Sequence, residues 1–382
     1  MRNQIKLFMI LNLIVIFSGL NLFGKVKKKQ PKVEIVFVLD TTGSMSSLIQ
    51  TAKNKIWSIA NTMAMAKPSP SIKMGILGYR DRNDKYITVQ TELTDDLDKI
   101  YKKLMSFSAN GGGDTPESVN QALHEAVLKN NWDSSLDTYK VIFLVGDAPP
   151  HMDYSNDVKY QETCKLALKK GIIINTIQCG SMSGTAKHWQ EIAKLGEGSY
   201  LSIAQSGGST IYKTPYDSEI NKLSQKMDAS RLYYGKQKEL DEGNKRKDIS
   251  SSISKESSSS SFAQRACYNI SSAGKKNYLG SKELVNDVSN GKINLDTLAE
   301  KELPAELKKV KKSERKGYVL KLSKERNELE KKILKLTKKR QQHIQKQVVD
   351  KKGDKNSFDQ KVFKCIQSQA KGKKLDLKEM KY

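Results

Sequence analysis

Cysteine is scarce in this chain of 382 residues, and the scarcity excludes one class of fold at once. The four cysteines are Cys164, Cys179, Cys267 and Cys365, and no two of them form a C-x-x-C pair. A fold held together by disulfides needs more cysteines at closer spacing. We therefore expect four free, packed thiols inside a fold that a hydrophobic core stabilises.

Histidine is equally rare, and the common catalytic signatures are absent. The four histidines form no H-E-x-x-H motif. The segment "GSMSG" has Met182 where a nucleophile elbow needs serine, and the glycines at 111–113 are not followed by the Gly-Lys-Ser/Thr of a phosphate loop. These absences disfavour a zinc protease, a serine hydrolase and a nucleoside triphosphatase.

Acidic residues are too few to balance the basic ones. The chain has 42 Asp and Glu against 67 Lys and Arg, a net charge of +25. The excess is uneven, at about +7 for residues 1–32, about −1 for 33–210 and about +19 for 211–382. The basic tail predicts either an anionic partner, with an envelope surface favoured over nucleic acid, or a simply solvated lysine-rich helix.

A long apolar run occurs only near the N-terminus. Residues 7–23 are mostly apolar and follow a short basic start, which is typical of an export signal over residues 1–24. An uncleaved membrane anchor is the alternative, and the lysines just after the run oppose translocation. We expect an exported protein that is periplasmic, secreted or anchored and facing outward.

Short Val- and Ile-rich segments alternate with amphipathic helical patterns over residues 33–210. Near-continuous apolar strands indicate burial on both faces, and strand–helix alternation predicts an α/β fold with a doubly wound, mostly parallel sheet flanked by helices. The predicted strands are 33–39, 72–79, 86–93, 140–146, 172–178 and 198–203.

The rest of the chain has a different composition. We expect a helical extension over 211–248, a serine-rich linker over 249–261 and a basic, mainly helical tail over 262–382. Within this tail, residues 305–349 allow a coiled coil. Arg326 and Arg340 fall where its seam needs apolar residues.

Three acidic loops fall at predicted strand ends or helix starts. They are "LDTTGSM", "GGGDTPES" and "VGDAPPH", and in a doubly wound sheet such loops converge. The acids they bring together are Asp40, Asp114, Glu117 and Asp147. Carboxylates at 4 Å repel by about 1 to 4 kcal/mol, which a hard divalent cation removes. Neutral oxygens from Thr42, Ser44 and Thr115 lie beside them in sequence.

At these residues the chain resembles the von Willebrand factor A family, over roughly residues 33–234. The family's metal-ion-dependent adhesion site has the form Asp-x-Ser/Thr-x-Ser with ligands from two later loops. The resemblance implies that Asp40, Thr42 and Ser44 form the first loop and that Asp147 belongs to the last. The implied cation is Mg²⁺, with Ca²⁺ or Mn²⁺ as alternatives.

The middle ligand stays open between Thr115 and Glu117. Many family members carry a threonine after two glycines, whereas "GDTPES" is similar to the Asp-Ser-Pro-Glu loop of integrin beta subunits. That second comparison implies a neighbouring cation site at Asp81 and Asp114. The tail is also similar to the helical ends of some exported bacterial proteins with this domain.

The resemblance implies a cation-dependent protein-interaction or adhesion module of the cell envelope, not an enzyme, whose metal binds an acidic residue of a partner protein. One alternative is a metal with a purely structural role in an envelope protein anchored by its basic tail. A second is a Mg²⁺-dependent phosphohydrolase with Asp40 as nucleophile. The family of such phosphohydrolases generally requires an acid where this chain has His151. It also requires a lysine, for which Lys129 is only a loose match.

Overall fold

The computed structural model describes residues 30–113, 115–208, 210–350 and 357–377, without the side chains of 349 and 350. The chain divides into Met1–Gln30 and Pro31–Tyr382, and the description concerns the second unit. The predicted export segment over 1–24 lies outside the described residues. Among the described helices, none is both long and apolar enough to cross a bilayer.

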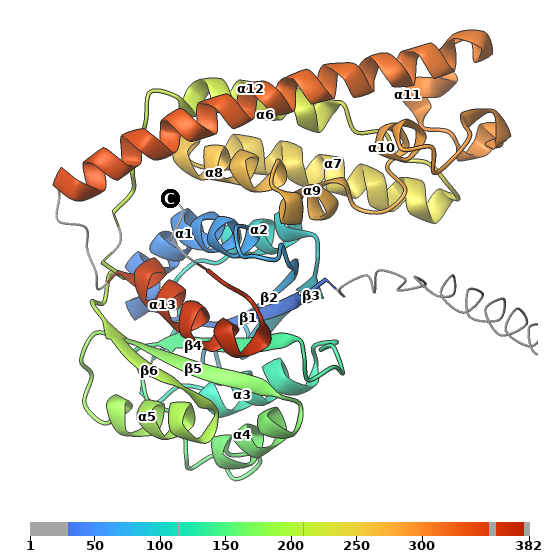
Figure 1. Ribbon diagram of the computed structural model, residues 1–382. Coiled ribbons are helices and arrows are strands. Elements are labelled where there is room, and N and C mark those ends of the chain that lie inside the picture. The colour runs from blue at the N-terminus through green and yellow to red at the C-terminus, as the bar shows by residue number, and fades with distance from the viewer. Residues whose placement is uncertain (1–29, 114, 209, 351–356, 378–382) are drawn as a thin grey trace, which may run out of the picture. The chain divides into compact units, whose positions relative to one another are not determined.

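A six-stranded sheet forms the centre of the first half of the chain (Figure 1). Its strand order is β3-β2-β1-β4-β5-β6, and only the β2–β3 pair is antiparallel. The predicted doubly wound fold is therefore confirmed. The strands are β1 (Lys32–Asp40), β2 (Ser71–Tyr79), β3 (Thr88–Thr94), β4 (Tyr139–Gly146), β5 (Ile172–Cys179) and β6 (Glu197–Ile203).

The central strand β1 defines where a ligand can bind. It pairs in parallel with β2 on one side and β4 on the other, and the chain winds outward in both directions from there. Open α/β sheets bind ligands beyond the carboxyl ends of strands at such a switch point. Asp40 lies opposite Tyr79 at that end, and Asp147 follows β4 directly.

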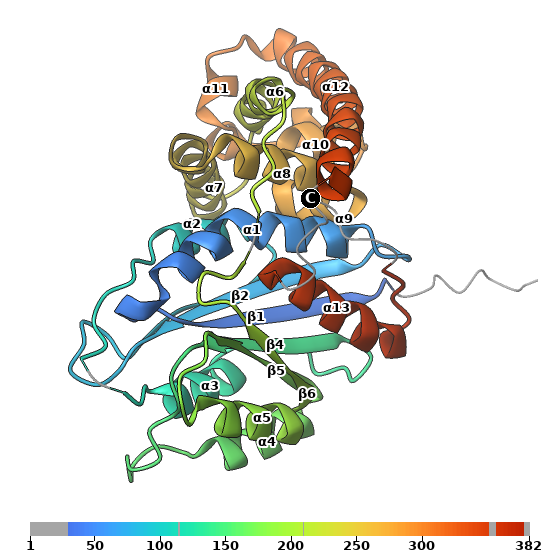
Figure 2. The same cartoon turned by 90° about the vertical axis from the view of Figure 1, so that its left-hand side faces the viewer.

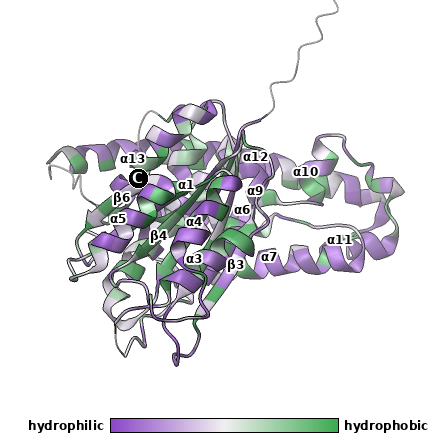
Figure 3. Cartoon of the chain, turned by 90° about the horizontal axis from the view of Figure 1, so that it is seen from below, coloured by the Kyte–Doolittle hydropathy of each residue, from purple (hydrophilic) through white to green (hydrophobic). Residues whose placement is uncertain are grey.

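Helices cover both faces of the sheet (Figure 3 shows hydrophobic colouring along its strands). On one face, α3 (Val119–Leu128), α4 (Tyr160–Lys169) and α5 (Thr185–Leu195) bury their apolar sides against the sheet. The other face carries α1 (Ser46–Ala64), α2 (Leu97–Met105) and, from far along the chain, α13 (Phe358–Ala370).

Helix α13 completes the sheet domain although more than 140 residues separate it from β6. Figure 2 shows it beside α1 on the same face of the sheet. The ring of Phe358 lies 6.4 Å from that of Phe37 in β1, and the Tyr139 hydroxyl donates to Gln369 over 2.8 Å. The predicted tail over 262–382 is therefore not one unit, because its end belongs to the sheet domain's core.

The helical region lies between β6 and α13 in the chain. Its helices are α6 (Asp217–Ala229), α7 (Gln237–Glu256), α8 (Ser259–Asn269), α9 (Ser272–Leu279), α10 (Leu284–Ser289), α11 (Ala305–Lys308) and α12 (Arg315–Asp350).

The predicted linker over 249–261 is wrong, because these serines lie mainly in α7 and α8. Serine serves here as a cap and a buried partner: Ser258 caps α8, and Ser250 donates to Asp98 in α2 over 2.7 Å. The second of these bonds ties the helical region to the sheet domain.

The heptad seam of α12 packs against other helices of the same chain. Its buried positions include Val319 and Ile333, which contact the helical region's two apolar clusters. The two arginines that interrupt the seam are buried in ion pairs, Arg326 with Glu283 at 2.9 Å and Arg340 with Asp217 at 2.9 Å. Acids from α6 and from the start of α10 thus replace the apolar contacts that a coiled coil would supply.

Candidate metal centre

The first loop of the site begins where β1 ends. Asp40 is fully buried, and its Oδ1 accepts hydrogen bonds from the Thr42 backbone nitrogen (2.8 Å) and hydroxyl (2.6 Å). The Thr42 hydroxyl lies 3.3 Å from that of Ser44, whose residue is exposed. The second oxygen of Asp40, Oδ2, is buried without a hydrogen-bond partner. The loop therefore presents one free carboxylate oxygen beside two hydroxyls.

Asp147 approaches the same place from the end of β4. Its Oδ2 accepts a hydrogen bond of 2.7 Å from the side-chain amide of Gln205, which follows β6. Its backbone carbonyl accepts from the Thr185 hydroxyl at the start of α5 over 3.0 Å. The other carboxylate oxygen, Oδ1, is buried without a partner. The aspartate is thus held at two points and keeps one oxygen free.

Glu117 is the third buried acid of the site. Its backbone nitrogen donates to Pro149 (2.9 Å), and its carbonyl accepts from the nitrogen of His151 (3.0 Å), so the loop before α3 is pinned to the loop after β4. Its Oε2 is buried without a hydrogen-bond partner. Each of the three acids, Asp40, Glu117 and Asp147, therefore has one buried oxygen with no protein donor.

The glycine loop at 111–113 folds over the first loop. The Gly111 carbonyl accepts from the Gly43 nitrogen over 3.1 Å. Gly112 has a φ of +75°, and a Cβ there would lie 2.9 Å from the Cβ of Thr42 and 3.2 Å from Oε1 of Glu117. A side chain at Gly112 would push these two loops apart, so the glycine permits their close approach.

The raised pKa values of the buried acids indicate that the site lacks a positive charge. Burial, together with the nearby charge of Asp147, raises the pKa of Asp40 to about 7. Burial raises the pKa of Glu117 to about 9, with added repulsion from Asp40 and other acids. Buried polar atoms in folded proteins almost always have a partner. Three unpartnered carboxylate oxygens near one another are therefore what a bound cation would explain.

The donor set limits how a cation would bind. Within the part of the chain that the structure describes, no three His, Cys, Asp or Glu side chains are grouped closely enough to ligate a metal together. Mg²⁺ commonly keeps several waters and takes only one or two carboxylates directly. The residues therefore fit a cation that the hydroxyls of Thr42 and Ser44 bind and that the carboxylates neutralise mainly through water.

The structure places the two candidates for the middle ligand differently. Glu117 is 3 % exposed and lies beside Thr42 and the other acids. Thr115 is exposed to solvent. Asp114 lies outside the described residues. The geometry therefore brings Glu117 to the site and leaves Thr115 at the surface.

Asp81, named for a second cation site, has protein donors for both oxygens. Oδ1 accepts from Ser118 (2.7 Å) and Oδ2 accepts from the hydroxyl of Tyr154 (2.8 Å). The ring of His151 stacks on Tyr154 with centroids 3.9 Å apart. Asp81 is the one residue of that second site among the described residues, and it has no free carboxylate oxygen of the kind seen at Asp40.

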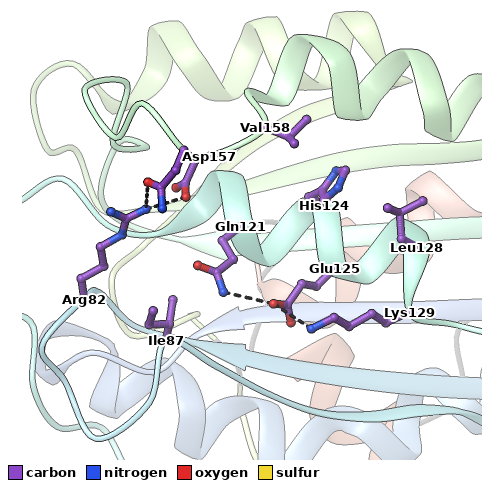
Figure 4. A pocket seen from close by; sticks show the side chains of 10 residues that line it. Arg82, Ile87, Gln121, His124, Glu125, Leu128, Lys129, Asp157 and Val158 are labelled. Atoms are coloured by element: carbon purple, nitrogen blue, oxygen red, sulfur yellow. Dashed lines mark hydrogen bonds and ion pairs between the residues drawn. The ribbon is translucent and has the colours of Figure 1, made fainter.

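Lys129, the loose match to a hydrolase lysine, binds elsewhere. Its amine pairs with Glu125 at 2.9 Å at the end of α3. Figure 4 shows this pair in a surface pocket of about 480 Å³, together with Arg82, which pairs with Asp157 at 2.7 Å. The amine of Lys129 is thus engaged at a pocket in which Asp40 takes no part.

Two residues of the site escaped the sequence analysis. The Tyr79 hydroxyl is buried without a partner, and burial together with the nearby charge of Asp40 raises its pKa. The sequence feature that could have indicated Tyr79 was its hydroxyl at the end of the neighbouring strand, in register with Asp40. Gln205 lies in "AQSGG", a further small-residue segment at a strand end.

Together, the doubly wound sheet and the acid- and hydroxyl-bearing loops at its switch point define a Rossmann-like domain with a candidate cation site. Residues 34–215 match the family model of the von Willebrand factor A domain. This part of the chain is therefore a von Willebrand factor A domain, which confirms the family resemblance.

The chain is similar to the ariadne-like RING finger protein R811 of Acanthamoeba polyphaga mimivirus, with 29% identity over 124 residues. The match covers 32% of this chain and only 12% of that protein.

Among solved structures, similar chains include BatB from Bacteroides thetaiotaomicron, with 19% identity and a TM-score of 0.34 over 45% of this chain and 90% of that one. The SpRpn10 VWA domain has 16% identity and a TM-score of 0.35 over 46% and 89%. Proximal thread matrix protein 1 from the mussel byssus, with a zinc-occupied MIDAS motif, has 18% identity and a TM-score of 0.37 over 46% and 42%.

Proposed function

We propose that this protein is a divalent-cation-dependent interaction module that binds an acidic residue of a partner protein through a metal at Asp40, Thr42, Ser44, Glu117 and Asp147. The observation that carries the proposal is the convergence of three buried carboxylates that each keep one oxygen without a donor. Mg²⁺ is the proposed ion, because the donor set is entirely oxygen and includes neutral hydroxyls.

The exposed position of Ser44 gives the site access to solvent. A cation held by Thr42 and Ser44 would be reachable from solvent and could take an anionic ligand, for which a carboxylate is the natural choice with a hard cation. The protein's own role is to fix the loops that carry Asp40 and Asp147.

The proposal includes a place for the protein. The apolar run over residues 7–23 supports export, by cleavage of a signal or as an anchored chain facing outward. Mass spectrometry of the mature chain tests this part. A first residue near Lys25 supports a cleaved signal, and retention of Met1 supports the anchor.

A capture experiment tests the function itself. The full chain is immobilised and incubated with envelope extract in Mg²⁺ or in chelator, beside the double variant Asp40→Ala with Asp147→Ala. We expect proteins that the wild type retains only in Mg²⁺ and that the double variant does not retain. Equal capture under all conditions would leave the metal with a structural role only.

A further inference from the structure

Helix α12 separates its charged residues into two faces. It has 36 residues and runs along the outer edge of the helical region in Figure 1. All three of its arginines are engaged with acids on other elements: Arg315 with Glu300, and Arg326 and Arg340 in the buried pairs described above. The inner face is therefore neutralised by the rest of the chain.

The charged side chains on the outer face of α12 are mostly lysines. Two of the helix's acids, Glu325 and Glu328, are exposed as well, and Glu328 pairs with Lys331 at 2.8 Å. Glu330 binds Lys275 of α9 at 2.9 Å. Nine exposed lysines thus outnumber two exposed acids along the described side chains of α12. They are Lys316, Lys321, Lys324, Lys331, Lys332, Lys335, Lys338, Lys339 and Lys346.

Two exposed leucines share this outer face. Leu320 is 47% exposed and lies one turn before Lys324. Leu334 is 49% exposed and lies one turn after Lys331 and one turn before Lys338. Residues three or four apart lie on the same side of a helix. The face therefore combines a row of flexible cations with two apolar side chains that have no role in the chain's own core.

We propose that this outer face of α12 binds an anionic lipid surface. A helix of this length presents its charges along about 54 Å, a straight line that suits a planar array of head groups. Lysine stems reach head-group phosphates while Leu320 and Leu334 enter the boundary of the acyl chains. A nucleic-acid backbone offers these leucines no apolar partner, and the arginines best suited to phosphate recognition face inward.

The contact does not depend on the proposed metal site. No acid of that site lies on α12, and the lysines are charged whether or not a cation is bound. Lipid binding is therefore expected to be unchanged by chelator. The lipid proposal can thus fail or hold independently of the proposed metal-dependent function. It is expected to weaken with salt, because exposed charges are screened.

The test uses the full chain and vesicles of phosphatidylcholine with or without phosphatidylserine. The α12 variant changes Lys324, Lys331, Lys335 and Lys338 to glutamine. The control variant makes the same change at four exposed lysines of α4 and α5: Lys165, Lys169, Lys187 and Lys194. Both variants lose the same net charge and keep the apolar run at residues 7–23. Thermal melts establish that both variants are folded.

We expect sedimentation with phosphatidylserine vesicles to weaken at least tenfold in the α12 variant and less than twofold in the control. Leu320→Ser with Leu334→Ser should also weaken binding while its salt dependence stays unchanged. Equal losses in the two lysine variants, or binding to neutral vesicles alone, would overturn the proposal. Binding of double-stranded DNA but not vesicles, with the same loss in the α12 variant, would overturn it in favour of nucleic acid.

Discussion

The side-chain amide of Gln205 donates a hydrogen bond of 2.7 Å to Oδ2 of Asp147, which leaves Oδ1 as the aspartate's free oxygen. The same amide lies 3.2 Å from the backbone carbonyl of Ser44. One side chain from the end of β6 thus connects the first and last loops of the candidate metal centre. Gln205 is a positioning residue for the site.

Removing this amide should weaken cation binding while the fold persists. We expect Gln205→Ala to lower Mg²⁺ affinity by about tenfold, as losses of outer-shell partners do. Titration calorimetry measures the change, and Gln190→Ala at an exposed position of α5 is the matched control. Identical Mg²⁺ affinities in the two variants would remove Gln205 from the site.

The pH dependence of stability follows from the raised carboxyl pKa values. Without a cation, the folded chain keeps protons on Asp40 to about pH 7 and on Glu117 to about pH 9, above their ordinary values of 3.8 and 4.5. The folded state then binds more protons than the unfolded state, so stability falls as pH rises between those limits.

Thermal melts in chelator should therefore lose several degrees between pH 5 and pH 9, and excess Mg²⁺ should flatten this slope because it stabilises the charged forms. Glu117→Gln should raise the melting temperature in chelator at high pH. The arrangement would be contradicted if the slope of melting temperature against pH stayed the same when Mg²⁺ is added to the wild type and also in the Glu117→Gln variant.

The assignment of the middle ligand is tested by a pair of variants. We expect Glu117→Gln to lower Mg²⁺ affinity at least tenfold, because it removes a buried charge beside Asp40 and Asp147. Thr115→Val changes an exposed side chain and should cost less than twofold. A larger loss in the valine variant, measured by titration calorimetry, would transfer the role to Thr115.

Helix α13 should behave as part of the sheet domain. Phe358 is 2 % exposed and packs against Phe37, so Phe358→Ala should lower the free energy of unfolding by about 3 to 5 kcal/mol. Lys364→Ala, at an exposed position of the same helix, should change it by less than about 0.5 kcal/mol. Denaturant unfolding measures both, and equal effects would mean that α13 is not a core element.

Local sequence predicted the sheet well, because each buried strand is a short apolar run. The structure confirms all six strands within two residues at either end. The loop acids were also visible in sequence, since strand ends converge at a switch point. Asp40, Glu117 and Asp147 are the acids that the structure brings together.

What the sequence could not show depends on contacts between distant segments. The small-residue loop around Gln205 does not by itself indicate that this side chain reaches Asp147, 58 residues earlier. Arg326 and Arg340 are unfavourable in a seam until Glu283 and Asp217 are known to face them. The serines at 250–261 have the composition of a linker, and only their capping and buried hydrogen bonds place them in helices.

The central claim is that Asp40 and Asp147 hold a divalent cation. Thermal melts of the wild type and of Asp40→Ala with Asp147→Ala, each with chelator and with excess Mg²⁺, test it most directly. The account predicts that Mg²⁺ stabilises the wild type by several degrees and leaves the double variant unchanged. Equal stabilisation of both proteins by Mg²⁺ would contradict it.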